Sequence, residues 1–205
     1  KRSMVLAQGT SDALKVLSRN EQVTFLMPLL TAFVALLHRY TGQDEVLIGT
    51  DVANRNRVEI ENVIGFFVNL LPIRVDLTGN PTSRDLLRRV RDTLLGAYAH
   101  QDVPFDKLVA KLNPRRDPSR NPLVQILFVL QNGPDYARTL LPGLTVGPFD
   151  VDAGIARFDL VLFVTERDHQ LMATWNYNTD LFEDATIHRM MTQYEEMLSC
   201  VVTRP

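Results

Sequence analysis

The longest apolar run of the chain constrains its fold more than any other feature. It reads FLMPLLTAFVALL and starts at Phe25. A helix that crosses a bilayer needs about 20 apolar residues, whereas this run has about 13 and contains a proline. A helix that is apolar all round is buried all round in a globular core. We therefore expect a buried helix that begins at Val23 or Thr24, extends to Tyr40 and stops at Gly42.

Hydrophobic spacing and turn residues predict further helices and strands on both sides of this run. Helices are expected over 12–20, with Ser11 as the N-cap, and over 82–100, 104–112 and 183–202. Strands are expected over 45–53, 65–77, 123–132, 157–167 and 169–182, the last two as an antiparallel pair. Pro72 places its strand at a sheet edge or a bulge. The order of elements predicts an α+β fold with helices packed on a mixed β-sheet.

Charge and cysteine content exclude several classes of protein. The net charge of -2, from 22 basic and 24 acidic side chains, gives no electrostatic basis for binding nucleic acid or a membrane. Cys200 is the one cysteine, so no internal disulfide forms and a reducing, cytoplasmic location is expected. The chain does not start with Met and lacks a signal peptide, which predicts that it was cut from a longer protein.

The stretch AHQDVPFDKLV raises the question whether His100 and Asp102 form a catalytic couple. Pro104 forces Val103 out of the helical region, and nothing in the stretch supplies a nucleophile or an oxyanion site. A role in ending a helix and ordering a loop is the favoured interpretation. None of the four histidines has a second His, Cys or carboxylate at metal-ligand spacing, so no metal site is predicted.

Three longer segments carry a more specific signal. In order they are VLIGTDVANRNRVEIENVIGFFVNLLPIR, HQDVPFDKLV and RRDPSRNPLVQILFVLQN. They resemble the last three core motifs of the condensation domains of nonribosomal peptide synthetases, and the resemblance covers nearly the whole chain. It implies one chloramphenicol-acetyltransferase-like lobe, of the two that meet in a V around an active-site tunnel.

The resemblance also implies which half of the domain this chain represents. The family's catalytic motif, two adjacent histidines followed by three variable residues and Asp-Gly, does not occur here. Residues 1–205 therefore resemble the C-terminal lobe, without catalytic residues and inactive alone, and 133–156 is expected to be an arm that crosses to the N-terminal lobe. Such a domain forms amide bonds between a donor acyl or peptidyl thioester and an acceptor aminoacyl thioester.

The resemblance implies roles for particular residues as well. Gln125 and Asn69 are candidates to face the substrate tunnel, because a lone amide in an apolar strand is otherwise a costly buried group. The alternative, that both amides bond neighbouring backbone, stays open. The motif residues expected to shape the fold are Arg55, Gly65, His100, Asp102, Pro104, Phe105, Asp117, Ser119, Arg120 and Asn121.

The implied partners are the N-terminal condensation lobe, the donor and acceptor peptidyl carrier proteins and an adjacent adenylation domain. No cofactor binds directly, since phosphopantetheine is carried by the carrier proteins. Two alternatives stay open. One is a non-catalytic lobe that recruits other proteins, and the other is part of a heterocyclisation or epimerisation domain.

Overall fold

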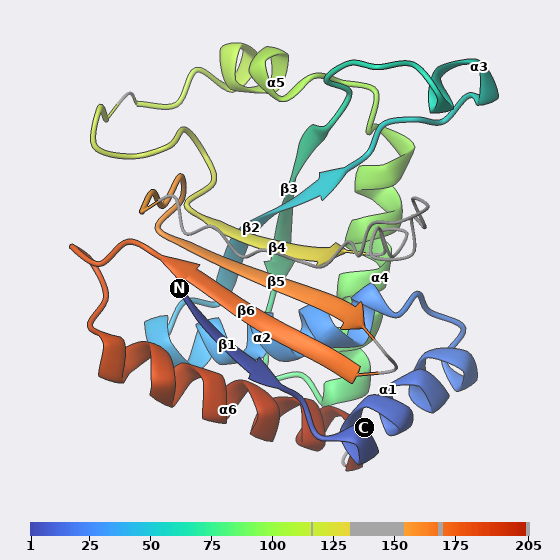
Figure 1. Ribbon diagram of the computed structural model, residues 1–205, viewed down its shortest axis with the longest axis vertical. Helices are drawn as coiled ribbons and strands as arrows, with labels where there is room; N and C mark the ends of the chain where they lie inside the picture. The colour runs from blue at the N-terminus through green and yellow to red at the C-terminus, as the bar shows by residue number, and fades with distance from the viewer. Residues whose placement is uncertain (116, 132–153, 168–169, 204–205) are drawn as a thin grey trace, which may run out of the picture.

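The computed structural model describes residues 1–115, 117–131, 154–167 and 170–203 (Figure 1). The arm predicted over 133–156 lies outside the described residues up to residue 153. The described elements are β1 (Arg2–Val5), α1 (Gln8–Asn20), α2 (Leu26–Thr41), β2 (Glu45–Val52), α3 (Val58–Glu61), β3 (Asn69–Asp76), α4 (Ser83–Ala99), α5 (Phe105–Leu112), β4 (Ile126–Gln131), β5 (Leu160–Arg167), β6 (Gln170–Tyr177) and α6 (Asp184–Thr203).

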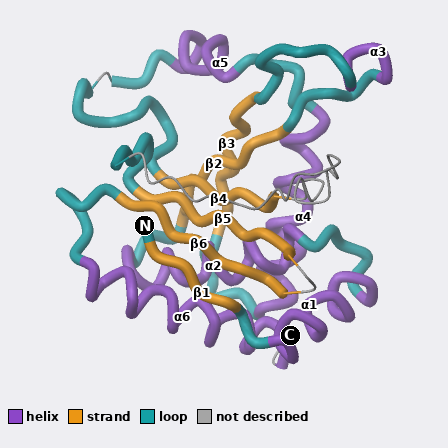
Figure 2. The backbone as a smooth tube through the Cα atoms, in the orientation of Figure 1, coloured by secondary structure: helices purple, strands orange, loops and turns teal. Residues whose placement is uncertain are grey.

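The strands form one six-stranded sheet in the order β1-β6-β5-β4-β2-β3 (Figure 2). The pairs β4–β5 and β2–β4 are parallel, and the pairs β1–β6, β5–β6 and β2–β3 are antiparallel. The sheet is therefore mixed, and the predicted α+β class is confirmed. β3 is an edge strand, which is where Pro72 was expected, because proline has no N–H to give to a second neighbour.

Four helices cover one face of this sheet and enclose the main core. α2 packs against α1, α4 and α6, and every residue between Met27 and Leu37 except Ala35 is buried. Gly42, whose φ of 65° is left-handed, caps the helix, so the buried helix with a glycine stop is confirmed, although it begins at Leu26 and not at Val23 or Thr24. The aromatic rings at its contact with the sheet and α6 belong to Phe33, Phe128, Trp175 and Tyr194.

The opposite face of the sheet has a smaller apolar cluster. Val124, Leu127, Val129 and Val161 are buried there, apart from the main core. Gly49 of β2 belongs to this face. A Cβ added at Gly49 would lie 2.8 Å from Val124 Cγ1 and 2.9 Å from Leu127 Cδ1, closer than side chains pack. The chain therefore needs glycine at this position for β2 to pair with β4.

The structure corrects several predicted boundaries. Ser11 is not the N-cap of α1, because the helix begins at Gln8 and the Ser11 hydroxyl donates to the Ala7 carbonyl from within it. The strand predicted over 65–77 begins only at Asn69. Gln125 lies one residue before β4 and not within it. β1 and α3 were not predicted at all, since each has only four residues and no clear periodicity.

No helix among the described residues is long and apolar enough to cross a membrane.

Candidate functional site

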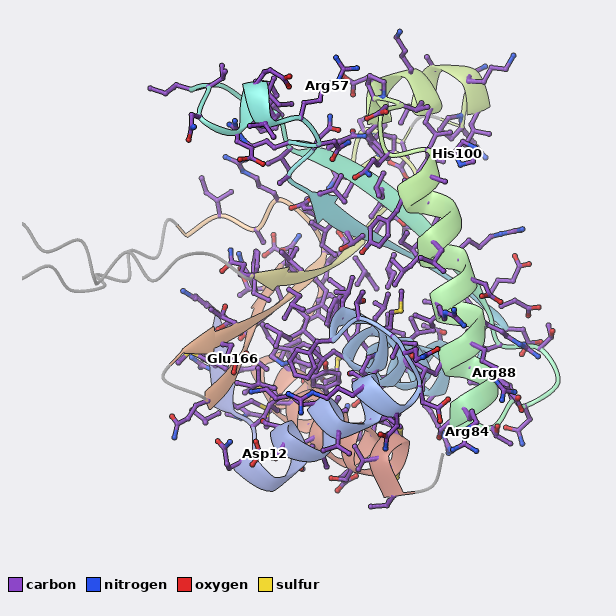
Figure 3. All side chains as sticks on the ribbon, turned by 90° about the vertical axis from the view of Figure 1, so that its right-hand side faces the viewer. Asp12, Arg57, Arg84, Arg88, His100 and Glu166 are labelled. Carbon is purple, nitrogen blue, oxygen red and sulfur yellow. The ribbon has the colours of Figure 1, made fainter. Side chains whose placement is uncertain are left out.

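Most of the motif residues gather at one end of the molecule. Here β2 ends, β3 begins, and α4 gives way to α5, while α1 and α6 lie at the other end (Figure 1). Figure 3 shows Arg57 and His100 together at this end, with Arg84 at the opposite end of α4. Neither α3 nor α5 has a fully buried residue, although Phe105 of α5 packs partly buried against the smaller apolar cluster, so side-chain hydrogen bonds contribute much of what holds this end.

Arg55 fixes the segment that follows β2. Its Nη1 donates to the carbonyl oxygens of Ile60 and of Val63, the latter at 2.9 Å, and its Nη2 donates to the Gly65 carbonyl at 3.3 Å. The guanidinium carbon also lies 4.3 Å from the centroid of the Phe67 ring. The structure therefore brings Arg55 and Gly65, both predicted motif residues, into direct contact.

Asn69 at the start of β3 holds the junction between α4 and α5. Its Nδ2 donates to the carbonyls of Gln101, at 2.9 Å, and Val103, at 2.8 Å. Its Oδ1 accepts the backbone N–H of Phe105 at 3.0 Å. Both amide hydrogens are thus committed to backbone, which favours the structural interpretation of Asn69 over a role facing a tunnel.

No hydrogen bond or ion pair in the described part of the chain joins His100 to Asp102. The Nδ1 of His100 lies 2.9 Å from the Gly96 carbonyl, one turn back in α4. The Asp102 carboxylate accepts a hydrogen bond of 3.3 Å from the Asn56 side chain. Pro104 then provides the N-cap position of α5. Both side chains thus form hydrogen bonds at the end of α4 and in the loop after it, and their role in ordering that loop stays a prediction.

The loop between α5 and β4 is held by its own polar side chains. The Asp117 carboxylate accepts from the Ser119 hydroxyl at 2.6 Å and from the Ser119 backbone N–H at 2.9 Å. These hydrogen bonds lower the pKa of Asp117, and Arg120, 4.0 Å away, adds to the effect. Asn121 donates to the Arg157 carbonyl at 2.6 Å and so ties the loop to the segment before β5. The hydrogen bonds of Asp117, Ser119 and Asn121 thus lie within this loop or between it and the segment before β5.

A groove of about 1110 Å³ separates this loop from α5. Gln125 lines it, and Arg115 and Arg120 supply its cationic side chains. The Nε2 of Gln125 donates to the Asn121 carbonyl at 2.8 Å, which occupies one of its two amide hydrogens. One amide hydrogen of Gln125 is therefore bonded to the backbone, while its side-chain oxygen has no hydrogen-bond partner among the described residues.

The predicted residues thus form two groups with α5 between them. Asn69 binds the first residue of α5, while Asp106, Val109 and Ala110 of the same helix line the groove with Gln125. No hydrogen bond within the described part of the chain joins Asn69 to Gln125. The described residues also contain no group of three His, Cys, Asp or Glu side chains that could hold a metal ion.

One feature of this end is not evident in the sequence. Ile64 is 101% exposed and Phe66 is 90% exposed, and Val58, Val63 and Val68 are exposed beside them in the chain. The apolar pattern from Gly65 to Leu77 predicts one strand, which would bury alternate residues. The residue in the sequence that could have indicated the loop is Gly65. In the structure, a Cβ added at Gly65 would lie 3.0 Å from the Phe67 ring.

Comparisons with known proteins agree on one family. The family model "Condensation domain" matches residues 1–205. A linear gramicidin synthase protein of Brevibacillus parabrevis is 51% identical over 195 residues, which are 94% of this chain and 2% of that protein. The chain therefore spans only a small part of the length of this relative.

Two solved structures extend the likeness to three dimensions. A four-domain nonribosomal peptide synthetase, solved in its holo form with AMP and glycine, superposes with a TM-score of 0.90 and 27% identity, over 98% of this chain and 16% of that one. The condensation domain of the Monacolin K polyketide synthase superposes with a TM-score of 0.86. It is 22% identical and is matched over 100% of this chain and 47% of its own.

Proposed function

The chain belongs to the condensation domain family of nonribosomal peptide synthetases, and from this we propose that it is the C-terminal half of a domain that forms amide bonds. One observation carries the proposal. The whole chain superposes on 47% of a solved condensation domain, so a domain of that size has a second half of similar length. The three motifs that resemble the end of the family pattern support the assignment of this half as the C-terminal one.

In the proposed reaction two carrier proteins deliver their thioesters on phosphopantetheine arms to a tunnel between the halves. The amine of the acceptor aminoacyl group attacks the carbonyl of the donor thioester. The new C–N bond forms as the C–S bond breaks, the donor thiol leaves, and the amine loses a proton. Holding the two arms in line supplies much of the rate gain in such a reaction, because it converts a bimolecular step into an intramolecular one.

This half contributes wall and floor to the tunnel rather than a general base. Gln125 is the residue that we place on the substrate path, because it lines the groove and one side of its amide has no partner among the described residues. An amide dipole aimed at a developing oxyanion stabilises the transition state more than the ground state. The proposed partners are the N-terminal half, donor and acceptor carrier proteins and an adjacent adenylation domain.

The proposal is tested with donor and acceptor carrier proteins loaded with their acyl groups. We expect the intact domain to release the amide product, as followed by mass spectrometry, and the 205-residue chain alone to release none. Turnover by the chain alone would contradict the proposal. An intact domain that makes no amide and yet binds a tailoring protein would favour the recruitment alternative.

A further inference from the structure

Arg55 is half-buried and stands where β2 has ended and α3 has not yet begun. Besides its contacts to Ile60, Val63 and Gly65, its Nη1 lies 3.2 Å from the Glu61 carbonyl. One nitrogen with two hydrogens is thus within reach of three carbonyl oxygens, so at least one hydrogen is shared. A planar guanidinium can serve several carbonyls at once, which a lysine ammonium on a flexible stem does less well.

Little else in the described structure holds this segment. α3 has four residues, no side-chain cap at its first turn and no buried residue. The Phe67 ring lies under the guanidinium and over Gly65, where a Cβ would be 3.0 Å away. Arg55, Gly65 and Phe67 therefore form a cradle that sets the path of residues 60–67.

The cradle directs two large apolar side chains into solvent. Ile64 and Phe66 lie on either side of Gly65 in the sequence, and both are almost fully exposed. Holding such side chains outward has no benefit for this chain by itself, since burial of apolar area is what stabilises a fold. An ordered apolar projection is typical of a surface that meets a partner.

We infer that Arg55 is a positioning residue: it preforms the segment 60–67 so that Ile64 and Phe66 contact the other half of the condensation domain. The inference rests on the proposed function. The occupant is the second half because the chain superposes on only 47% of a condensation domain, which leaves a partner of similar length within the same protein. Preforming the segment removes the cost of ordering it when the halves meet.

The test compares three variants of the intact domain. Arg55→Gln removes the guanidinium, and Arg55→Lys keeps the positive charge but loses the planar set of N–H donors. Arg57→Gln is the control. Arg57 is exposed, and its side chain makes no hydrogen bond or ion pair among the described residues. Each variant is measured for amide hydrogen exchange over 58–66, for its melting temperature, and for the kcat of amide formation and the KM for each carrier protein.

We expect both Arg55 variants to exchange faster over 58–66 and to lose about tenfold in kcat, because a misplaced contact between the halves misaligns the two thioester arms. The KM for either carrier protein should stay unchanged, since the segment contacts the other half and not a carrier. The melting temperature of the core should also stay unchanged, and Arg57→Gln should match the parent in every measurement. Full activity in Arg55→Lys would show that charge alone suffices and would overturn the inference.

Two further outcomes decide the remaining cases. Faster exchange with an unaltered kcat in Arg55→Gln would also overturn the inference, because amide formation would then not depend on the order of this segment. If that variant fails to fold, Phe66→Ser decides, since it keeps the cradle and removes the projected ring. It should lower kcat without changing exchange over 58–66. A parent domain that forms no amide would contradict the proposed function, while exchange would still report on the cradle.

Discussion

At the scale of single residues, Gly49 gives the sharpest prediction. Gly49→Ala places a methyl group 2.8 Å from Leu70 Cδ1 and from Val124 Cγ1. Because Val124 is buried and cannot swing into solvent, the sheet must shift. We expect the free energy of unfolding to fall by about 1–3 kcal/mol, the usual cost of overpacking. Urea denaturation measures it.

Gly96→Ala is the matched control for this change. Gly96 lies inside α4, and a Cβ there meets nothing within 4 Å. Alanine stabilises an exposed helix interior over glycine by up to about 1 kcal/mol. Equal effects at Gly49 and Gly96 would show that the close approach between β2 and β4 is not needed.

Gln125→Leu tests the residue placed on the substrate path. Leucine has a similar volume, and the change removes one hydrogen bond, that to the Asn121 carbonyl. Water in the groove can satisfy this carbonyl, so we expect a loss of stability below about 1 kcal/mol. In the intact domain the single-turnover rate should fall by about tenfold to a hundredfold. A destabilised protein with an unaltered rate would remove Gln125 from the site.

At the scale of elements, Asp184 joins the first turn of α6 to the sheet. Its carboxylate accepts hydrogen bonds from Arg2, at 2.7 and 3.0 Å, and from the Tyr177 hydroxyl at 2.8 Å. These bonds lower the pKa of Asp184 from its usual 3.8 to about 2. A lowered pKa in the folded state means that the charged form stabilises the fold. This contribution is complete above about pH 4 and is lost as the pH falls towards 2.

We therefore expect Asp184→Asn to lower the melting temperature at neutral pH, and this difference from the parent should shrink between about pH 4 and pH 2. Asp180→Asn is the control, because Asp180 is exposed and its carboxylate forms no ion pair among the described residues. Melting curves at a series of pH values measure both variants. A difference that stays constant down to pH 2 would contradict the assignment.

The sequence predicted the long elements well, because their signals are local. α2 was identifiable from an apolar run and α4 from its helical spacing, whereas the N-cap of α4 at Thr82 was found only in the structure. The parallel pairing of β4 with β5 and with β2 was not identifiable, because register depends on contacts between segments far apart in the chain. β1 was missed because its four residues pair only with β6.

The site was predicted by residue type more than by geometry. Arg55 and Gly65 were named as motif residues, yet their contact depends on the turn after β2, which no pattern fixes. Asn69 was a candidate for the tunnel because an amide beside apolar residues looked unpaired. Its partners, the backbone of residues 101–105, lie more than thirty residues away in sequence. The roles of Asn69 and Gln125 could not be separated before those contacts were visible.

At the scale of the whole molecule, stability should be uneven. The main core joins α1, α2, α4 and α6 to the sheet, whereas α3 and α5 bury no residue. Segments with few buried contacts open locally without global unfolding. We expect amides of 58–66 and 105–112 to exchange faster than those of α2, by mass spectrometry of the native chain. Equal protection throughout would contradict this division.

Trp175 offers a second measurement of the same division. It is the one tryptophan of the chain, and it is fully buried against Phe33 and Tyr194. Its fluorescence therefore reports on the main core alone. We expect its unfolding transition in urea to coincide with that of the far-ultraviolet circular dichroism, because the same core holds most of the helical residues. A fluorescence midpoint well above the dichroism midpoint would show that the helices unfold separately from the sheet.

The pairing of β1 with β6 also has a consequence for synthesis on the ribosome. Arg2 pairs with Trp175 and Val5 with Met172, so about 170 residues of chain separate the partners. At roughly 5–20 residues per second, the first strand emerges about 10 to 30 s before its partner exists. During that interval Phe33 of α2 lacks the Trp175 ring of β6, which later packs against it. The nascent chain is therefore most open to aggregation before translation reaches Tyr177.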